Sequence, residues 1–129
     1  MPDLLPFHSG LRYLVLLAGF AAAAYALARW AQKREFDRNA RIFGAVYTGL
    51  LDLQVLVGVI TLLGREFQPI LFGHIAMMVV AMVVAHVATF RSRRLPPSRE
   101  ALRFQFIGIG ISLGLIFAGI MALGRGPLA

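Results

Sequence analysis

The chain contains no cysteine. This absence excludes disulfide bonds, thiolate metal sites and the Cys-x-x-Cys-His attachment of a c-type haem. Acidic residues are also scarce, because six Asp and Glu stand against thirteen Lys and Arg, which gives a formal net charge of +7 at pH 7. No segment outside the apolar runs is large enough to fold alone, so an enzyme acting on a soluble macromolecule is not expected.

Long apolar runs dominate the sequence. Hydrophobic residues make up 59% of the 129 residues, and the mean hydropathy is +0.76. A soluble domain this short cannot bury so much apolar surface, so the lipid bilayer is the expected solvent. The runs are continuously apolar rather than alternating, which favours helices of about 20 residues that cross the hydrocarbon core. The sequence predicts an all-α, integral membrane four-helix bundle in one domain, with spans at Leu11–Trp30, Ile42–Leu63, Pro69–Phe90 and Phe104–Leu123.

The basic residues gather in two of the three connections between these spans. Ten of them lie in or beside the first and third connections: Arg29, Lys33, Arg34, Arg38, Arg41, Arg91, Arg93, Arg94, Arg99 and Arg103. Only Arg12, Arg65 and Arg125 lie elsewhere. The positive-inside rule then places both basic loops in the cytoplasm and both termini outside, in a multi-pass protein of the bacterial cytoplasmic (inner) membrane. Topology and contact with anionic lipid explain the charge, so no nucleic-acid partner is expected.

The first span is expected to be retained, because Asp3 is the only charge before Arg12 and a cleaved signal peptide needs a basic start. The short turn between the second and third spans predicts a tight antiparallel hairpin. Ser98 is the expected N-cap of the fourth span, after a non-helical Pro-Pro connection. Two rows of small residues predict close helix packing in lipid: Ala18, Ala22 and Ala26 on the first span, and Gly110, Gly114 and Ala118 on the fourth.

Two of the three histidines, His8 and His74, are expected at one level near the outer face. His8 stands just before the first span, and His74 lies four or five residues into the third, roughly 7 Å below the interface. An imidazole is costly in hydrocarbon and usually has a partner or a function there. Two imidazoles on different helices would supply both axial ligands of a haem iron. The structural alternatives are a headgroup-level surface position for His8 and a hydrogen-bonded core position for His74.

Other residues could complete such a haem site. Met77 and Met78 follow His74 at i+3 and i+4 on the same helix face, so they could pack on the porphyrin or replace His8 as the sixth ligand. Arg12 and Arg65 are cations on the same side that could pair with the haem propionates. Because the chain has no cysteine, the haem would be held without covalent bonds.

The second span carries a polar stripe of Gln54, Gly58 and Thr61, nearly opposite Asp52. A glycine between polar residues suits the edge of a cofactor as well as it suits helix packing. Asp52 lies near the middle of the span, where an ionised carboxylate is very unfavourable. It is therefore expected to be protonated, paired with another helix or part of a proton path.

His86 lies twelve residues after His74, roughly 18 Å deeper, with no second histidine at its level. A second bis-histidine haem is therefore disfavoured. We expect Tyr47 and Thr48 to satisfy His86 by hydrogen bonds, and a quinone or proton-relay role is the alternative. The depth of Asp52 falls between the two histidines, so no direct contact with either is expected.

The segment 53–61, the turn after it and the segment 73–76 resemble a helix pair in one half of haem A synthases. In that family a Gln-x-x-x-Gly helix precedes a helix that opens with a haem-ligand histidine, and a partner histidine opens the helix before. The resemblance implies ligand positions for His8 and His74. The outer-loop cysteines and the acidic catalytic residue of the family have no match, so a haem-holding scaffold is implied and haem hydroxylation is not.

Nearly the whole chain is also similar to small four-span bacterial membrane proteins described as cytochrome-b-like. The shared motifs are His-Ser-x-Leu-Arg at 8–12, Leu-Gln-x-Leu-x-Gly at 53–58 and a third-span histidine followed by Met-Met. Many of those proteins have a histidine where this chain has Asp52 and an acidic residue where it has Gly73. These departures weaken any second haem or metal site and leave His8 and His74 intact.

The sequence therefore predicts a membrane protein with one non-covalent haem b per chain and no catalytic residue of its own. With both axial positions filled, the iron favours one-electron transfer over oxygen activation. The electron partner would be quinone or a larger respiratory or photosynthetic complex. The alternative is a non-catalytic accessory subunit of such a complex without its own haem, and a small transporter or metal-handling protein is a third hypothesis.

Overall fold

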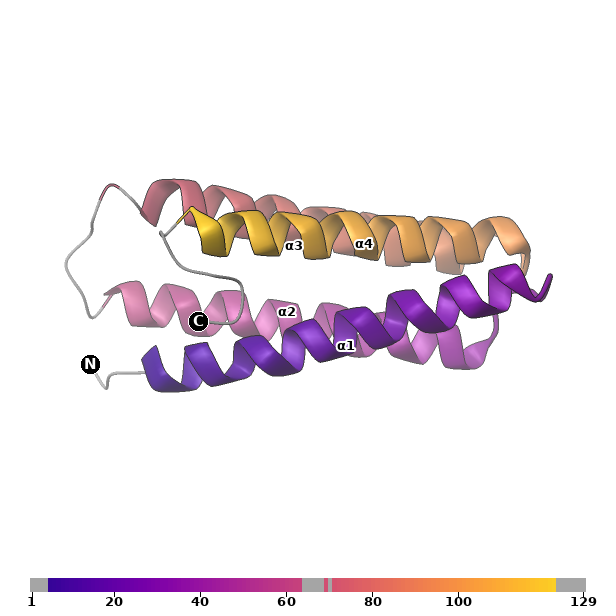
Figure 1. Cartoon of the computed structure of the whole chain (residues 1–129), viewed down its shortest axis with the longest axis horizontal. Coiled ribbons are helices and arrows are strands. Elements are labelled where there is room, and N and C mark those ends of the chain that lie inside the picture. Colours follow the sequence, from indigo (N-terminus) through magenta and orange to yellow (C-terminus); the bar gives the residue numbers. More distant parts are fainter. Residues whose placement is uncertain (1–4, 64–68, 70, 123–129) are drawn as a thin grey trace.

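Four antiparallel helices form a bundle in the computed structural model, which describes residues 5–63, 69 and 71–122 (Figure 1). The helices are α1 (Leu5–Ala31), α2 (Arg38–Leu63), α3 (Leu71–Arg94) and α4 (Arg99–Met121). Each is long and apolar enough to cross a membrane. The predicted all-α class and the four candidate spans are confirmed.

Five of the eight helix ends lie beyond the predicted spans, because hydropathy marks only the part that crosses hydrocarbon. Backbone hydrogen bonding continues into the polar interface, where arginine is a good helix former. Thus α3 runs on to Arg94, and α4 begins at Arg99. The largest difference is at the start of α1, which begins at Leu5 and so includes His8 in its first turn.

Of the other ends, α2 stops at Leu63 as predicted, α3 begins at Leu71 instead of Pro69, and α4 ends at Met121. The predicted end of the fourth span at Leu123 lies outside the described residues.

Side chains cap the N-termini of two helices, α4 and α2. The Ser98 side chain accepts a hydrogen bond of 3.1 Å from the backbone N–H of Ala101, so the predicted N-cap of α4 is confirmed. Asp37 caps α2 in the same way, because its Oδ1 accepts from the N–H of Ala40 at 2.9 Å. The other oxygen, Oδ2, accepts from the Tyr25 hydroxyl at 2.7 Å and pairs with Arg29 Nε at 3.3 Å. One carboxylate thus ties the start of α2 to α1.

Burial raises the pKa of Asp37, but the hydrogen bonds from Ala40 and Tyr25 and the charge of Arg29 outweigh it, so the pKa lies below its ordinary value of 3.8. The unfolded chain then binds more protons than the folded chain in acid. We expect Asp37→Ala to lower the unfolding free energy in detergent by about 1 kcal/mol at neutral pH. This difference should shrink as the pH falls below 3.8, through the folded pKa.

The matched control is Asp37→Asn, which keeps a capping side chain and removes the charge. It should lose less stability at pH 7 than Asp37→Ala does. If Asp37→Ala showed the same loss at pH 3 as at pH 7, the ionised carboxylate would not be the source of the effect.

The tightest helix contact lies between α3 and α4, whereas α2 and α3 pack least among the neighbouring pairs. The predicted tight hairpin of the second and third spans is therefore wrong. Small residues decide the difference: a Cβ on Gly108 of α4 would collide with the Cβ of Ala88, and a Cβ on Gly119 would collide with Met78. The buried face of α3 consists of small side chains, namely Ala81, Ala85, Ala88, Thr89 and Ser92.

Only one of the two predicted small-residue rows faces a neighbouring helix. On α1, Ala22 and Ala26 are fully buried. On α4, Gly110 and Gly114 face outward, and among the described residues no atom lies within 4 Å of where their Cβ atoms would be. The prediction for the fourth span is wrong because its inward face is set by a different stripe, which includes Gln105, Ile109, Ser112, Ile116 and Gly119.

A buried hydroxyl network connects α2, α4 and α3. Ser112 Oγ donates to the carbonyl oxygen of Ala81 at 2.8 Å, and it lies 2.8 Å from the Tyr47 hydroxyl. Serine has one hydroxyl hydrogen, and Ala81 receives it, so Tyr47 must donate to Ser112. Tyr47 and Ser112 are both fully buried, so this network fixes the relative positions of three helices.

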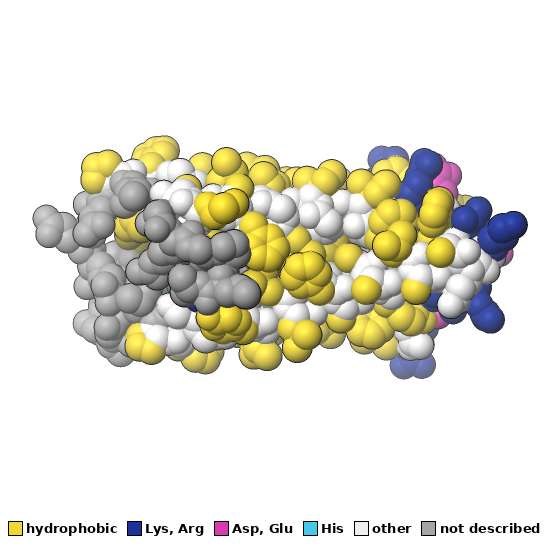
Figure 2. All heavy atoms as spheres, viewed as in Figure 1, with side chains coloured by type: hydrophobic (Ala, Val, Ile, Leu, Met, Phe, Trp, Pro, Cys, Tyr) yellow, Lys and Arg dark blue, Asp and Glu magenta, His cyan; other side chains and the backbone are white. Residues whose placement is uncertain are grey.

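Lys and Arg side chains gather at one end of the bundle, while apolar side chains cover most of its length (Figure 2). We call this the basic end; it comprises connections 32–37 and 95–98 with the adjoining helix turns. Its two connections are joined by a hydrogen bond of 3.2 Å from Phe36 N–H to the Ser98 carbonyl. Arg99 donates to the Trp30 carbonyl at 2.7 Å and lies over the Trp30 ring at 4.8 Å. The opposite end, where α1 and α3 begin, is called the histidine end.

Candidate functional site

His74 lies in the first turn of α3 at the histidine end, and its imidazole is held by α4. Nδ1 lies 3.0 Å from the carbonyl oxygen of Gly119. A carbonyl oxygen can only accept, so Nδ1 carries the hydrogen of this bond. In the neutral imidazole, Nε2 therefore keeps its lone pair. Metal-ligating histidines typically have this arrangement, with one ring nitrogen on a backbone carbonyl and the other available to the metal.

Gly119 packs closely against the face of α3 that carries His74. A Cβ there would lie 3.6 Å from His74 Nδ1 and 3.1 Å from the Cβ of Met77, and it would collide with the methyl group of Met78. The two methionines therefore share a helix face with His74, as the spacing predicts. Met78 is half-buried against the core, so it lies beside His74 as a packing residue.

His8 lies on α1 and rests on the backbone of α2. A Cβ on Gly58 would lie only 3.1 Å from His8 Cε1, so the ring occupies the space that a larger residue would need. Gln54 Nε2, one turn earlier on α2, donates to the His8 carbonyl at 2.9 Å. The polar stripe of the second span thus faces the inside of the bundle, and two of its residues position His8.

The structure places His8 on α1 and His74 on α3 at the same end of the bundle. These two helices lie diagonally across the bundle, since each packs mainly against α2 and α4. Arg12 follows His8 by about one turn of α1. Arg12 donates from Nη2 to the Tyr13 hydroxyl at 3.3 Å and lies over the Tyr13 ring at 5.0 Å. Arg65, the second cation predicted for the propionates, lies outside the described residues.

Buried polar atoms without partners gather at this end. Within the described residues, four buried side-chain nitrogen or oxygen atoms lack a hydrogen bond, and three of them are His8 Nδ1, Arg12 Nε and Gln54 Oε1. A buried unsatisfied polar atom costs roughly 1–3 kcal/mol, so such a group calls for an explanation such as a ligand. The histidine end is therefore polar on the inside, and the described residues leave part of its hydrogen-bonding capacity unused.

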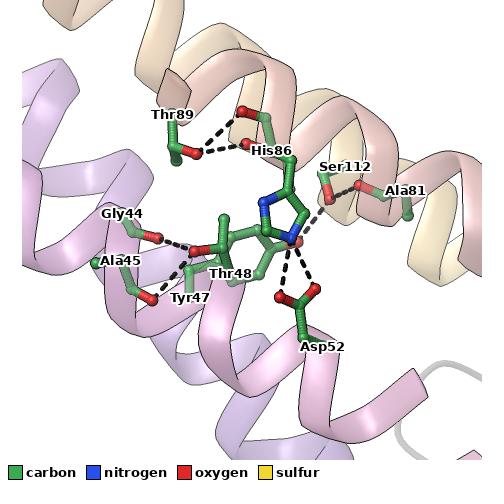
Figure 3. Close-up of polar contacts among 10 residues, drawn as sticks. Gly44, Ala45, Tyr47, Thr48, Asp52, Ala81, His86, Thr89 and Ser112 are labelled. Carbon is green, nitrogen blue, oxygen red and sulfur yellow. Dashed lines mark hydrogen bonds and ion pairs between the residues drawn. The ribbon is translucent and has the colours of Figure 1, made fainter. Parts of the chain in front are cut away.

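A second polar site joins α2 and α3 nearer to the basic end. His86 Nε2 lies 2.7 Å and 2.9 Å from the two carboxylate oxygens of Asp52 (Figure 3). The expectation of no contact between Asp52 and a histidine is wrong, as is the expectation that Tyr47 and Thr48 satisfy His86. Tyr47 instead bonds to Ser112, and the Thr48 hydroxyl bonds to carbonyls of its own helix.

The missed contact has a geometric reason. Depth can be counted at about 1.5 Å per residue from the histidine end, where α2 ends and α3 begins. On this count the backbone of His86 lies about 6 Å deeper than that of Asp52. In a helix each Cα–Cβ bond tilts toward the N-terminus, and α2 and α3 run in opposite directions. His86 therefore leans toward the histidine end and Asp52 toward the basic end, which closes the gap.

Comparison with models of protein families, with curated proteins and with solved structures gives no match. The resemblances drawn from the sequence motifs therefore remain predictions. Within the described residues, no group of three or more His, Cys, Asp or Glu side chains could hold a metal ion. A site built from His8 and His74 needs a group that brings its own equatorial ligands, as a porphyrin does.

Proposed function

We propose that this chain is a membrane b-type haem protein for one-electron transfer, with one non-covalent haem b held by His8 and His74. The observation that carries the proposal is the hydrogen bond from His74 Nδ1 to the Gly119 carbonyl, 3.0 Å long. It presents Nε2 as a ligand and raises the basicity of the ring.

The other residues at the histidine end suit the same group. His8 has a buried Nδ1 with no partner among the described residues. Its ring lies against Gly58, and its backbone carbonyl accepts a hydrogen bond from Gln54. Arg12 offers a positive charge beside the pair, which suits a propionate. When bound, the haem iron would supply one-electron redox chemistry. The contribution of the chain would be to hold and orient the two imidazoles and to exclude water from them.

We further propose that the basic end faces the cytoplasm and the histidine end faces outward, in a bacterial inner membrane. The concentration of Lys and Arg at one end supports this orientation. An electron carrier with its redox group near the outer side would exchange electrons with quinone in the bilayer or with a larger respiratory or photosynthetic complex.

The test is a visible spectrum of the detergent-purified protein after titration with haemin. We expect one haem per chain, with sharp α and Soret bands on reduction by dithionite. His74→Ala and His8→Ala should each remove the low-spin bis-imidazole spectrum, because each deletes one axial ligand. His86→Ala is the matched control, since it deletes an imidazole of the same bundle away from the site, and it should keep the bands.

A folded, colourless wild-type protein that takes up no haem would contradict the proposal, as would loss of the bands in His86→Ala alone. A colourless protein that copurifies in fixed ratio with a larger membrane complex would support the accessory-subunit alternative. The outward row of Gly110 and Gly114 on α4 is the observation that favours that alternative, because small residues permit close approach of a helix.

A further inference from the structure

The pair of Asp52 and His86 is a second functional candidate, separate from the histidine end. Both carboxylate oxygens lie within 2.9 Å of His86 Nε2. An ionised carboxylate can only accept, so when Asp52 is ionised Nε2 carries the shared hydrogen. Among the described residues, Nδ1 has no hydrogen-bond partner. In the neutral imidazole Nδ1 is an acceptor, and in the imidazolium form it is a donor.

This pair lies on the outside of the bundle, at a depth where the surroundings are apolar. The side chains are 50% exposed for His86 and 46% exposed for Asp52. His86 is five residues from Arg91, which is about 8 Å along the axis of α3. Val83, Val87 and Phe90 surround it on the exposed side of α3. A polar pair open to hydrocarbon is costly, so a hydrogen-bonding group from outside the bundle is expected to cover it.

The groups near the pair are hydrogen-bond acceptors with no spare donor. Thr48 and Thr89 face one another from α2 and α3 beside the ring (Figure 3). Each threonine hydroxyl donates to carbonyls of its own helix, at 3.1 Å for Thr48 and 3.0 Å for Thr89. Their only hydroxyl hydrogens are therefore used, and the remaining lone pairs can only accept. A group that binds beside the neutral imidazole must therefore bring its own hydrogen-bond donor.

Space is available next to the pair on α2. Gly49 lies one turn before Asp52, and no described atom lies within 4 Å of where its Cβ would be. Ala45 is a small exposed residue one further turn away on the same side. Because α2 and α3 also pack least among neighbouring helices, a planar head group can approach the pair from the bilayer.

We propose that Asp52 and His86 bind the head group of a lipid-soluble quinol, whose hydroxyl donates a hydrogen bond to His86 Nδ1. A quinol combines the required donor with an apolar ring and tail, so it can arrive through lipid. When Nδ1 is protonated, the same nitrogen can donate to a quinone carbonyl, which lets the pair hold either form. This inference rests on the proposed function, because it locates the binding site of the quinone partner. Binding of the quinol itself requires no haem.

The test uses the full chain in nanodiscs without added haem. The probe is a benzoquinol with a ten-carbon alkyl tail, kept reduced under anaerobic conditions, and the protein carries ¹⁵N-labelled histidine. We expect a saturable shift of the His86 Nδ1 resonance with little change at His74. Asp52→Asn should weaken binding at least tenfold, because it removes the charge that fixes Nε2–H, and His86→Gln should abolish it.

His74→Ala is the matched control, since it should remove the haem spectrum and leave quinol binding unchanged. Failure of the quinol site and failure of the haem site are therefore distinguishable. Circular dichroism confirms that each variant is folded. The proposal is overturned if decylbenzene, which lacks hydroxyls, gives the same shift, or if both variants bind like the wild type. It is also overturned if the shift follows protein concentration instead of quinol, which would assign the pair to an interface between copies.

Discussion

Replacing Gly108 with leucine is expected to lower the unfolding free energy by about 3 kcal/mol, the largest effect we predict for a single substitution in the bundle. A Cβ at this position collides with the Cβ of Ala88 and lies 3.4 Å from its Cα. No rotamer relieves this collision, because Cβ is fixed by the backbone and the opposing atoms are those of α3 itself. The two helices must separate, and the dispersion contacts between α3 and α4 are then lost along their length.

The measurement is unfolding of the purified variants in mixed micelles with increasing SDS, followed by circular dichroism. Gly108→Ala should lose about 1–2 kcal/mol, and the second substitution Ala88→Gly should restore most of that loss by removing the opposing Cβ. The control is Gly110→Leu on the exposed side of the same helix, where no described atom lies within 4 Å of the added Cβ. Helix propensity favours leucine over glycine at both positions, so equal destabilisation by Gly110→Leu and Gly108→Leu would show that α3–α4 packing is not the source of the loss.

This substitution also connects packing to the candidate haem site. The bond between His74 Nδ1 and the Gly119 carbonyl requires α3 and α4 to stay at close range. We therefore expect Gly108→Leu to weaken haem binding, although Gly108 lies far along α4 from His74.

Tyr47→Ala is expected to have the second largest effect, a loss of about 2–3 kcal/mol. Tyr47 is fully buried, and its ring packs against Gly19 of α1, where a Cβ would lie 2.8 Å from Tyr47 Cε1. Large-to-small changes in soluble cores cost about 3–5 kcal/mol for aromatic residues. Part of that cost is the free energy of transferring the aromatic ring from water into the core. This part is absent here, because the unfolded helices remain in an apolar solvent. The cavity and the lost hydrogen bond to Ser112 remain.

Two milder variants separate the cavity from the hydrogen bond. Tyr47→Phe keeps the ring, and Ser112 still donates to Ala81, so the expected loss is about 1 kcal/mol. Ser112→Ala should cost more than Tyr47→Phe, because it leaves the buried Tyr47 hydroxyl with no acceptor. SDS unfolding of the three variants gives the order Tyr47→Ala, Ser112→Ala, Tyr47→Phe from largest to smallest loss. The reverse order for the last two would mean that Tyr47 is not the donor in this pair.

Local signals in the sequence were sufficient for the four helices and for the N-cap of α4, whereas the Asp37 cap of α2 was not predicted. Apolar runs of about 20 residues specify four helices, since every backbone group must be satisfied within the segment in lipid. Ser98 before Arg99 marks the start of α4 because a hydroxyl at that point satisfies a free N–H. The inward direction of Gln54 and Gly58 also follows from their spacing on one helix. These features depend on residues within a few turns of each other.

The choice of contacts between helices could not be read in the same way. Gly110 and Gly114 form a better small-residue row than Gly108 does, yet Gly108 meets Ala88 and the row faces outward. The rotation of α4 about its own axis depends on all of its packing contacts with α1 and α3. A short sequence motif cannot predict the combined effect of these contacts. For the same reason the sequence did not identify the Gly119 carbonyl as the partner of His74.

The amino-acid sequence is therefore sufficient to predict four apolar helices, the N-cap of α4, the basic end and the presence of His8 and His74 at the opposite end. The assembled bundle determines which groups those side chains contact. The Gly119 carbonyl fixes the His74 ring, and Asp52 reaches His86 across a difference in backbone depth of about 6 Å. The physical reason is that helix formation is local, whereas helix rotation and the tilt of Cβ bonds in antiparallel neighbours are properties of the assembled bundle.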